Sequence, residues 1–528
     1  MKLIQGLRIA LIAAAFGVSG SAVLLPVAAH DGAPTPTPTV SPTPRTVVTP
    51  TPQTVDALRA KILGRTLAFE ARRARVGIKI VSLNSGKVVF ESDADKYFVP
   101  ASNMKNFTVA AALEKLGPDF KFVTSVYAAA KPDSAGTIQG DLRILGRGDV
   151  SISTLFATKP ASDPGIYFER LDRIADAILS AGVKRIDGGI LADESYFTGN
   201  AIPYTWEWDD LQWYDGAEVS SFPINNNAVD LIVKGGSSGG PCIISIRPAN
   251  TLYQITNLCT TAGSKRGLVI KKSLEKNSVI ISGTIPAADT FTGYLTFTRP
   301  ADLFVALLKD RLIRKGVLVT GGTRSLTKGP IPSPQQAEIA RIESASFPQV
   351  AAMTMKPSQN MFTEVILWTM GEELGRKADG NGDSSQLGLG VVRSWLATAG
   401  IPADSVVQYD GSGLSRHDLV TPAAIVQLYT YMAKQSQNAQ VWRDSLTIGG
   451  VDGTLRNRFK GTAAAENMRG KTGTLDQVSA LSGYVTTAGG EQLVVSIMVN
   501  GMPVPSQRTS LIDDIVVSLA NFDGRIDQ

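Results

Sequence analysis

The sequence predicts an α/β domain in which helices from the two ends of the chain cover an antiparallel sheet, with an all-helical part beside it. A hairpin-like pair of apolar runs follows the first helical segment, and a second pair precedes the last one. Between residues 358 and 434 the apolar residues keep helical spacing. Beyond its N-terminal segments the chain has roughly 470 residues, more than one hydrophobic core usually serves, so we expect further domains.

The first 29 residues have the pattern of a secretory signal peptide. Lys2 and Arg8 flank the n-region, Ile9 to Val18 is apolar, and small residues at 27–29 form a cleavage site. Gly and Pro residues interrupt the apolar run before it reaches the ~20 residues that a membrane span needs. We expect removal of residues 1–29, no integral membrane segment in the mature chain, and a periplasmic or secreted protein.

Residues 30–54 form a Pro/Thr-rich segment, with seven prolines between Ala33 and Thr54. This composition cannot build a core and predicts an extended, semi-rigid linker. The formal charge of +5 falls to +3 once Lys2 and Arg8 leave with the signal peptide. The sequence has no dense basic run of the kind that nucleic-acid binders show, so we expect no nucleic-acid partner.

Each element of the α/β domain follows from a local pattern. Alternating apolar residues around Asn84-Ser85-Gly86 and Gly489-Gly490 predict two hairpins, which are 76–83 with 87–90 and 478–486 with 492–499. Apolar residues at helical spacing predict covering helices within 54–75, 104–116 and 511–519. The Gly117-Pro118 pair ends the second of these helices.

Three short motifs carry the chemistry: Ser102-Asn103-Met104-Lys105, Ser358-Gln359-Asn360 and Lys471-Thr472-Gly473. Together they are typical of a serine acyl-transferase that uses lysine as its base. Ser102 falls at a predicted helix N-terminus, where backbone N–H groups stabilise developing negative charge. Lys105 lies one turn further on the same face, as a nucleophile–base pair requires.

The first two motifs also occur elsewhere in the chain. Ser273-Leu274-Glu275-Lys276 and Ser325-Leu326-Thr327-Lys328 match the first, but we interpret them as solvated loops because no helix follows them. Ser358 is favoured over other Ser-x-Asn matches because Pro357 precedes it and an amphipathic helix is predicted after it. Locally, a simple helix N-cap explains Ser358 equally well.

Histidine and cysteine usage narrows the chemistry further. His30 and His417 are the two histidines, so a Ser-His-Asp triad would have to use His417, and a zinc hydrolase has too few ligands. We therefore expect no metal and no cofactor. Cys242 and Cys259 lie 17 positions apart in a chain that we expect to be exported, which favours a disulfide of about 3 kcal/mol over the alternative of two reduced thiols.

With these motifs the sequence resembles the type-4, class C penicillin-binding proteins, which are D-alanyl-D-alanine carboxypeptidases and endopeptidases of peptidoglycan. The resemblance runs from about Thr54 to Phe522. Besides the three motifs, it includes Gly146-Arg147-Gly148-Asp149, Asp193-Glu194-Ser195-Tyr196-Phe197, Asn225-Asn226-Asn227 and Asp410-Gly411-Ser412-Gly413-Leu414-Ser415-Arg416.

The resemblance implies a fold with a β-lactamase/transpeptidase-like domain and a β-rich insertion of two subdomains. We assign residues 55–120 and 340–528 to the former and 121–339 to the latter. Strand-like runs in the insertion agree with this, at 140–145, 188–192, 229–233, 279–285 and 293–297, and one helix is predicted at 300–315.

The family's residue roles transfer to the matching positions. Ser102 would attack the bond between two D-alanines, Lys105 would take its proton, and Ser358 would pass a proton to the leaving amine. The remaining substrate contacts implied are Asn360, Arg416, Lys471, Thr472, Gly473 and Thr474, with the N–H groups of Ser102 and Thr474 holding the oxyanion. Asp193 and Arg416 would bind the far end of the stem peptide and Phe197 would pack against it, unless Asp193 instead caps a turn.

The expected partners are peptidoglycan stem peptides ending in D-Ala-D-Ala and β-lactam antibiotics, which would acylate the same serine. Two alternatives remain open. One is a β-lactamase of the same chemistry, although no glutamate motif for activating its water is evident. The other is a catalytically silent wall-binding scaffold that keeps the fold.

Overall fold

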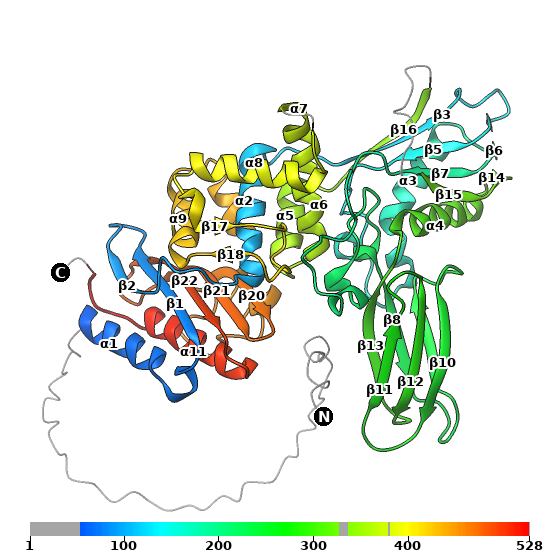
Figure 1. Ribbon diagram of the computed structural model, residues 1–528. Helices are drawn as coiled ribbons and strands as arrows, with labels where there is room; N and C mark the ends of the chain where they lie inside the picture. Colours follow the sequence, from blue (N-terminus) through cyan, green and yellow to red (C-terminus); the bar gives the residue numbers. More distant parts are fainter. Residues whose placement is uncertain (1–52, 327–335, 379–380, 527–528) are drawn as a thin grey trace, which may run out of the picture. The chain divides into compact units, whose positions relative to one another are not determined.

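The computed structural model describes residues 53–326, 336–378 and 381–526 (Figure 1). The predicted signal peptide, and the predicted linker up to residue 52, lie outside the described residues. The chain from Pro52 onward forms one compact unit. No helix in the described part of the chain combines the length and the hydropathy that a membrane crossing requires.

A six-stranded sheet joins the two ends of the chain. Its order is β19-β20-β21-β22-β1-β2, and all neighbouring strands are antiparallel. The strands are β1 (Arg75–Ser82), β2 (Val88–Ser92), β19 (Thr447–Ile448), β20 (Arg469–Leu475), β21 (Val478–Thr486) and β22 (Gln492–Asn500). Both predicted hairpins are therefore present, and the pairing of β1 with β22 unites them in one sheet.

Two terminal helices cover one face of this sheet, α1 (Val55–Thr66) and α11 (Pro505–Ala520) (Figure 1). Leu58 and Ile62 on α1 share a buried core with Ile515 on α11 and with the inward side chains of β21 and β22. The N-cap of α1 is Thr54, whose hydroxyl accepts the N–H of Ala57. This part of the fold agrees with the α/β class that the sequence predicts.

The other side of the sheet packs against an all-helical part. Its main helices are α2 (Lys105–Lys115), α5 (Phe347–Met355), α6 (Asn360–Met370), α8 (Ser384–Thr398), α9 (Pro422–Lys434) and α10 (Ala439–Ser445). Every residue of α6 is buried. The expectation of an amphipathic helix after Ser358 is therefore wrong, because α2, α8 and a turn of the insertion enclose α6 on all sides.

The segment between the two halves of the sheet has its own hydrophobic core, formed by residues from 126 to 342. One part of it holds a five-stranded sheet and a three-stranded sheet with two helices, α3 (Glu169–Ser180) and α4 (Pro300–Arg314). Those strands are β3 (Val123–Ala128), β4 (Thr137–Gln139), β5 (Leu142–Leu145), β6 (Arg185–Asp187), β7 (Ile190–Asp193), β14 (Leu318–Val319), β15 (Thr323–Leu326) and β16 (Ala337–Glu343).

The sequence predicts one helix in this region, at 300–315, which corresponds to α4; helix α3 was not predicted. The predicted division at residue 339 stays a prediction, and β16 runs across that position.

The other part of the insertion consists of two three-stranded sheets. Their strands are β8 (Ala228–Lys234), β9 (Ile243–Arg247) and β13 (Thr290–Thr296), and β10 (Gln254–Thr261), β11 (Gly267–Lys272) and β12 (Ser278–Ile285). A disulfide joins Cys242, next to β9, to Cys259 on β10, with Cα atoms 5.4 Å apart. The bond thus ties one sheet to the other.

Candidate active site

The predicted nucleophile lies in a short 3₁₀ turn, η2 (Ala101–Met104), that leads directly into α2. Ala101 has a positive φ of 48°, an uncommon conformation for a residue with a side chain. Two glycines make room for this turn, because a Cβ at Gly473 would lie 2.4 Å from the oxygen of Pro100 and one at Gly413 would lie 1.9 Å from that of Ala101. Ser102 is half-buried.

Lys105 is completely buried and its Nζ has three oxygen neighbours. It lies 2.9 Å from Ser102 Oγ, 2.6 Å from Asn360 Oδ1 and 2.7 Å from the carbonyl oxygen of Ser412. The two carbonyl-type oxygens can only accept hydrogen bonds, so they take two N–H groups of the amine. When the amine is neutral, its lone pair is left to face the hydroxyl of Ser102.

Burial lowers the pKa of Lys105 to about 8, because a desolvated ammonium is unfavourable. Four carboxylates oppose this shift by attracting the positive charge: Asp410, Glu364, Asp215 and Asp418. A lysine with such a pKa is neutral often enough near neutral pH to act as a base.

Ser358 and Lys471 form a second pair beside the first. Lys471 is fully buried and donates to Ser358 Oγ at 2.9 Å and to the carbonyl oxygen of Thr472 at 2.8 Å. Burial, and then the charge of Lys105, hold the pKa of Lys471 well below its usual range. Gln359 occupies the N-cap of α6, and Ser358 precedes it with a φ of 67°, so the simple N-cap explanation of Ser358 is wrong.

The third motif lies on β20, where Gly473 packs against η2. Thr472 is buried and donates from its hydroxyl to Thr454 Oγ1 at 2.7 Å, while Thr474 is exposed. The Asn103 amide donates to the carbonyl oxygen of Lys471 at 3.2 Å, which fixes the strand to the nucleophile's turn. All three motifs therefore meet at one place.

Asp193 and Arg416 each have another partner in the structure. Asp193 is fully buried at the end of β7, pairs with Arg143 and accepts the N–H of Ser195 at 3.0 Å. The hydrogen bond from Ser195 fits the turn-capping alternative, and the contact of Asp193 with the stem peptide stays a prediction. Arg416 instead contacts Glu207, with Nε 3.1 Å from Oε2, and donates to the carbonyl oxygen of Asp476.

Phe197 is half-buried and lies against the helical core. Its ring centroid is 5.5 Å from that of Trp368 on α6 and 5.1 Å from that of Tyr196. Within the described residues these aromatic contacts explain its position. Its proposed contact with substrate therefore stays a prediction.

Several residues that hold the site together were missed by the sequence analysis. Glu364 accepts the N–H groups of Gly411 and Ser412, and Asn360 Nδ2 donates to the carbonyl oxygen of Asp215 in the insertion. Trp206 Nε1 donates to Asp410 Oδ2 at 2.7 Å. The position of Glu364, four residues after Asn360 on one helix, could have indicated a shared face.

The other candidate groups lie away from these pairs. Ser273 accepts backbone N–H groups within its own turn, and His417 is exposed with its ring against Tyr409. Among the described residues, one acidic group could share a cation, Glu207 with Asp209 and Asp210, and it contains none of the predicted catalytic residues.

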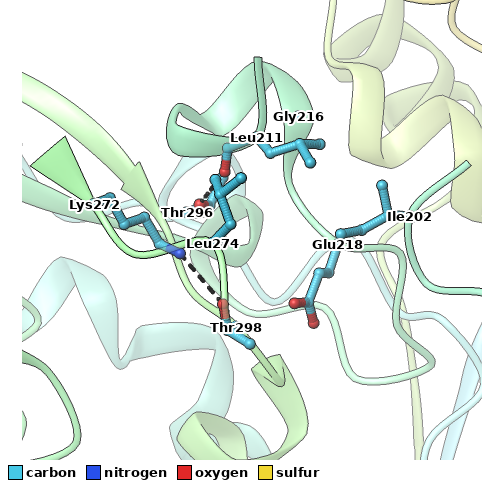
Figure 2. A pocket seen from close by; sticks show the side chains of 8 residues that line it. All are labelled: Ile202, Leu211, Gly216, Glu218, Lys272, Leu274, Thr296 and Thr298. Atoms are coloured by element: carbon cyan, nitrogen blue, oxygen red, sulfur yellow. Dashed lines mark hydrogen bonds between the residues drawn. The ribbon is translucent and has the colours of Figure 1, made fainter. Parts of the chain in front are cut away.

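Figure 2 shows a small cavity in the insertion between Glu218 and Lys272. Its volume of about 10 Å³ is near the lower limit for one water. Lys272 donates there to Thr298 Oγ1 at 3.3 Å. Such a cavity is too small for a peptide substrate.

Comparison with known proteins decides the family. The model of the D-Ala-D-Ala carboxypeptidase 3 (S13) family matches residues 59–522. The chain belongs to this S13 family. A D-alanyl-D-alanine carboxypeptidase of Actinomadura sp. (strain R39) is 33% identical over 464 residues, which are 85% of this chain and 81% of the relative.

This S13 protein is also similar to two proteins described from Haemophilus influenzae, one by sequence and one by structure. The D-alanyl-D-alanine carboxypeptidase DacB of that organism is 24% identical over 434 residues, covering 81% of this chain and 86% of the relative. The crystal structure of its penicillin binding protein 4 (dacB) is similar with a TM-score of 0.72 at 22% identity, over 88% of this chain and 98% of that one. The structural likeness confirms the predicted fold class.

Proposed function

We propose that the protein is a serine D-Ala-D-Ala carboxypeptidase that works through an acyl-serine intermediate. One observation carries this conclusion: the fully buried amine of Lys105 lies 2.9 Å from Ser102 Oγ, with its other neighbours accepting N–H groups. The family and its 33% identical relative, named a D-alanyl-D-alanine carboxypeptidase, support the same activity.

In the first step Ser102 Oγ attacks the carbonyl carbon of the penultimate D-alanine, and neutral Lys105 accepts the hydroxyl proton. The negative charge that develops on the carbonyl oxygen is stabilised by the N–H groups of Ser102 and Thr474. The C–N bond then breaks, and the leaving amine takes a proton through Ser358. Water attacks the ester, the acid product leaves, and Ser102 recovers its proton.

Lys471 has a different task in this mechanism. The C-terminal carboxylate of the substrate favours the charged form of Lys471, so in the complex the ammonium, with the hydroxyls of Thr472 and Thr474, binds that carboxylate. Lys471 also donates to Ser358 Oγ, which leaves the hydroxyl proton of Ser358 available for the leaving amine. Asn360 binds the acyl side of the substrate and at the same time holds Lys105.

The substrate class follows from the relatives. A penicillin binding protein 4 of Haemophilus influenzae has been solved with a β-lactam, and we propose that β-lactams acylate Ser102 of this chain as well. Stem peptides of peptidoglycan ending in D-Ala-D-Ala are the proposed natural substrates, with cleavage of peptide cross-links as a second activity. These substrates imply work outside the cytoplasm, as the predicted signal peptide does.

Labelling with a fluorescent penicillin, followed by timing its release, tests the proposal. We expect one persistent label per chain. Rapid loss of label would indicate a β-lactamase, and absence of label would indicate a silent scaffold. Ser102→Ala should abolish labelling without unfolding the protein, because it removes one half-buried hydroxyl. Ser273→Ala is the matched control and should label fully, since Ser273 serves its own turn.

A further inference from the structure

The motif from Asp410 to Arg416 also contacts the predicted base, Lys105. It forms a buried loop whose Ser412 carbonyl oxygen receives an N–H group of Lys105 at 2.7 Å. The loop contributes no other contact to Lys105 among the hydrogen bonds of the described residues. The position of that carbonyl therefore helps to decide how the amine is oriented, and so whether its lone pair faces Ser102.

Glu364 holds this loop from the helix beneath it. Its side chain is 1% exposed, and both of its oxygens are used: Oε1 accepts the N–H of Ser412 at 2.7 Å and Oε2 accepts the N–H of Gly411 at 3.0 Å. A carboxyl group has an oxygen to accept each of these bonds, whereas an amide would place an NH2 donor opposite one of the two N–H groups. Asp410 holds the far side of the loop by accepting the N–H groups of Gly413 and Ser415.

Glu364 and Asn360 are four residues apart on α6, so they lie one above the other on the same face. Asn360 Oδ1 accepts the second N–H of Lys105 at 2.6 Å. Helix α6 thus supplies one acceptor, Asn360 Oδ1, directly and fixes the other, the Ser412 carbonyl oxygen, through Glu364. The orientation of both N–H groups of Lys105 therefore depends on the placement of α6.

We propose that Glu364 is a positioning residue for acylation: by fastening Gly411 and Ser412 it fixes the carbonyl that aims the lone pair of Lys105 at Ser102. Glu364 itself does not touch the substrate. The inference rests on the proposed function, since it concerns the base of that reaction. It adds a residue whose contribution is made entirely through the protein backbone.

The protonation of Glu364 is also set by its surroundings. Burial and the neighbouring Asp410 raise the pKa of Glu364 to about 8, while Lys105 and the two backbone N–H groups oppose this rise. Below that pH Glu364 is mostly neutral, so its part in the site rests on the two N–H groups that it accepts and not on its charge.

Two substitutions remove the hold on the loop in different ways. Glu364→Gln keeps the shape but replaces one acceptor by an NH2 group. Glu364→Asp keeps the carboxyl group but is too short to reach both N–H groups. Glu194→Gln is the matched control, because Glu194 is also a largely buried glutamate with a pKa raised to about 7, yet it lies in the insertion beside Ser220.

The measurement is acylation by a fluorescent penicillin from pH 6 to 9.5, with the affinity of the initial complex and the acylation rate determined separately. For Glu364→Gln we expect unchanged affinity and an acylation rate lower by about tenfold or more across this pH range. For Glu364→Asp we likewise expect unchanged affinity and a lower rate. Glu194→Gln should match the parent in rate, affinity and pH profile.

A folded Glu364→Gln protein that acylates like the parent would overturn the inference, as would a loss confined to affinity. If Glu364→Gln does not fold, the acylation rate of Glu364→Asp is the test. A rate equal to that of the parent protein would then refute the positioning role. Failure of the proposed function looks different, because then the parent protein itself would take no label.

Discussion

The acylation rate should depend on pH through Lys105, and the structure sets the size of the effect. In the proposed mechanism deprotonated Lys105 is the active form, and burial brings its pKa from 10.5 to about 8. At pH 7 about one molecule in ten then holds the neutral amine, against about one in 3,000 for an ordinary lysine. The burial of this one side chain is therefore worth about 300-fold in active enzyme, or about 3 kcal/mol.

The sign of the pH effect follows from the same shift. Below the pKa of about 8 the fraction of neutral Lys105 grows tenfold per pH unit, so the acylation rate should rise with that slope from pH 6 to about 7.5. Above pH 8 the rate should level off, because nearly every molecule is active. The assay is the second-order rate constant for acylation by a chromogenic β-lactam, measured from pH 5.5 to 9.5.

The Lys471→Arg variant is the internal control for this profile. It keeps Lys105, so the rise should remain in the same pH range even where the overall rate is lower. A rate that is flat between pH 6 and 8 in folded protein would refute the reasoning, because Lys105 could not then be the group that loses a proton. A rise centred near pH 10 would show that burial does not perturb the lysine.

Three further predictions concern other parts of the molecule. Lys105→Arg should nearly abolish turnover of a D-Ala-D-Ala peptide while Lys471→Arg keeps measurable turnover, since arginine cannot act as a base but can still attract a carboxylate; the reverse order in steady-state kinetics would contradict the division of roles. Gly473→Ala should lower acylation about 100-fold in folded protein, because its Cβ would lie 2.4 Å from a carbonyl oxygen of the nucleophile's turn; a parent-like rate would show that the turn can yield. Mass spectrometry should find Cys242 and Cys259 linked, and two free thiols would contradict the bond. Replacing both cysteines by serine should lower the free energy of unfolding by about 3 kcal/mol, and with it the unfolding temperature, while penicillin labelling is retained.

Local patterns were enough to predict four of the six strands of the sheet, whereas β19 and β20 were not predicted. The expected hairpin at 478–486 and 492–499 corresponds to β21 and β22 within one residue, although helices cover both faces of these strands. Helix α3 was not predicted, although its apolar residues are strongly one-sided.

Burial imposed by distant segments could not be predicted in the same way. The helix after Ser358 looks amphipathic in isolation, yet residues far away in the sequence cover its outer face. Asp193 is also buried, because Arg143 on the neighbouring strand β5 pairs with it inside the protein. In both cases the sequence shows the type of a residue but not the partner that the fold brings to it.

The insertion also contacts the candidate active site, which the motifs alone did not indicate. Asn360 Nδ2 donates to the carbonyl oxygen of Asp215, and Asp410 accepts from Trp206, so a predicted catalytic side chain and a supporting loop each contact the inserted segment. If that segment were removed, two buried polar groups would lose partners, at about 1–3 kcal/mol each. The amide of Asn360 would also be free to turn, and its Oδ1 would no longer be held against Lys105. The chain segments on either side of the insertion therefore supply the proposed reacting groups, while the insertion supplies part of the rigidity that aims them.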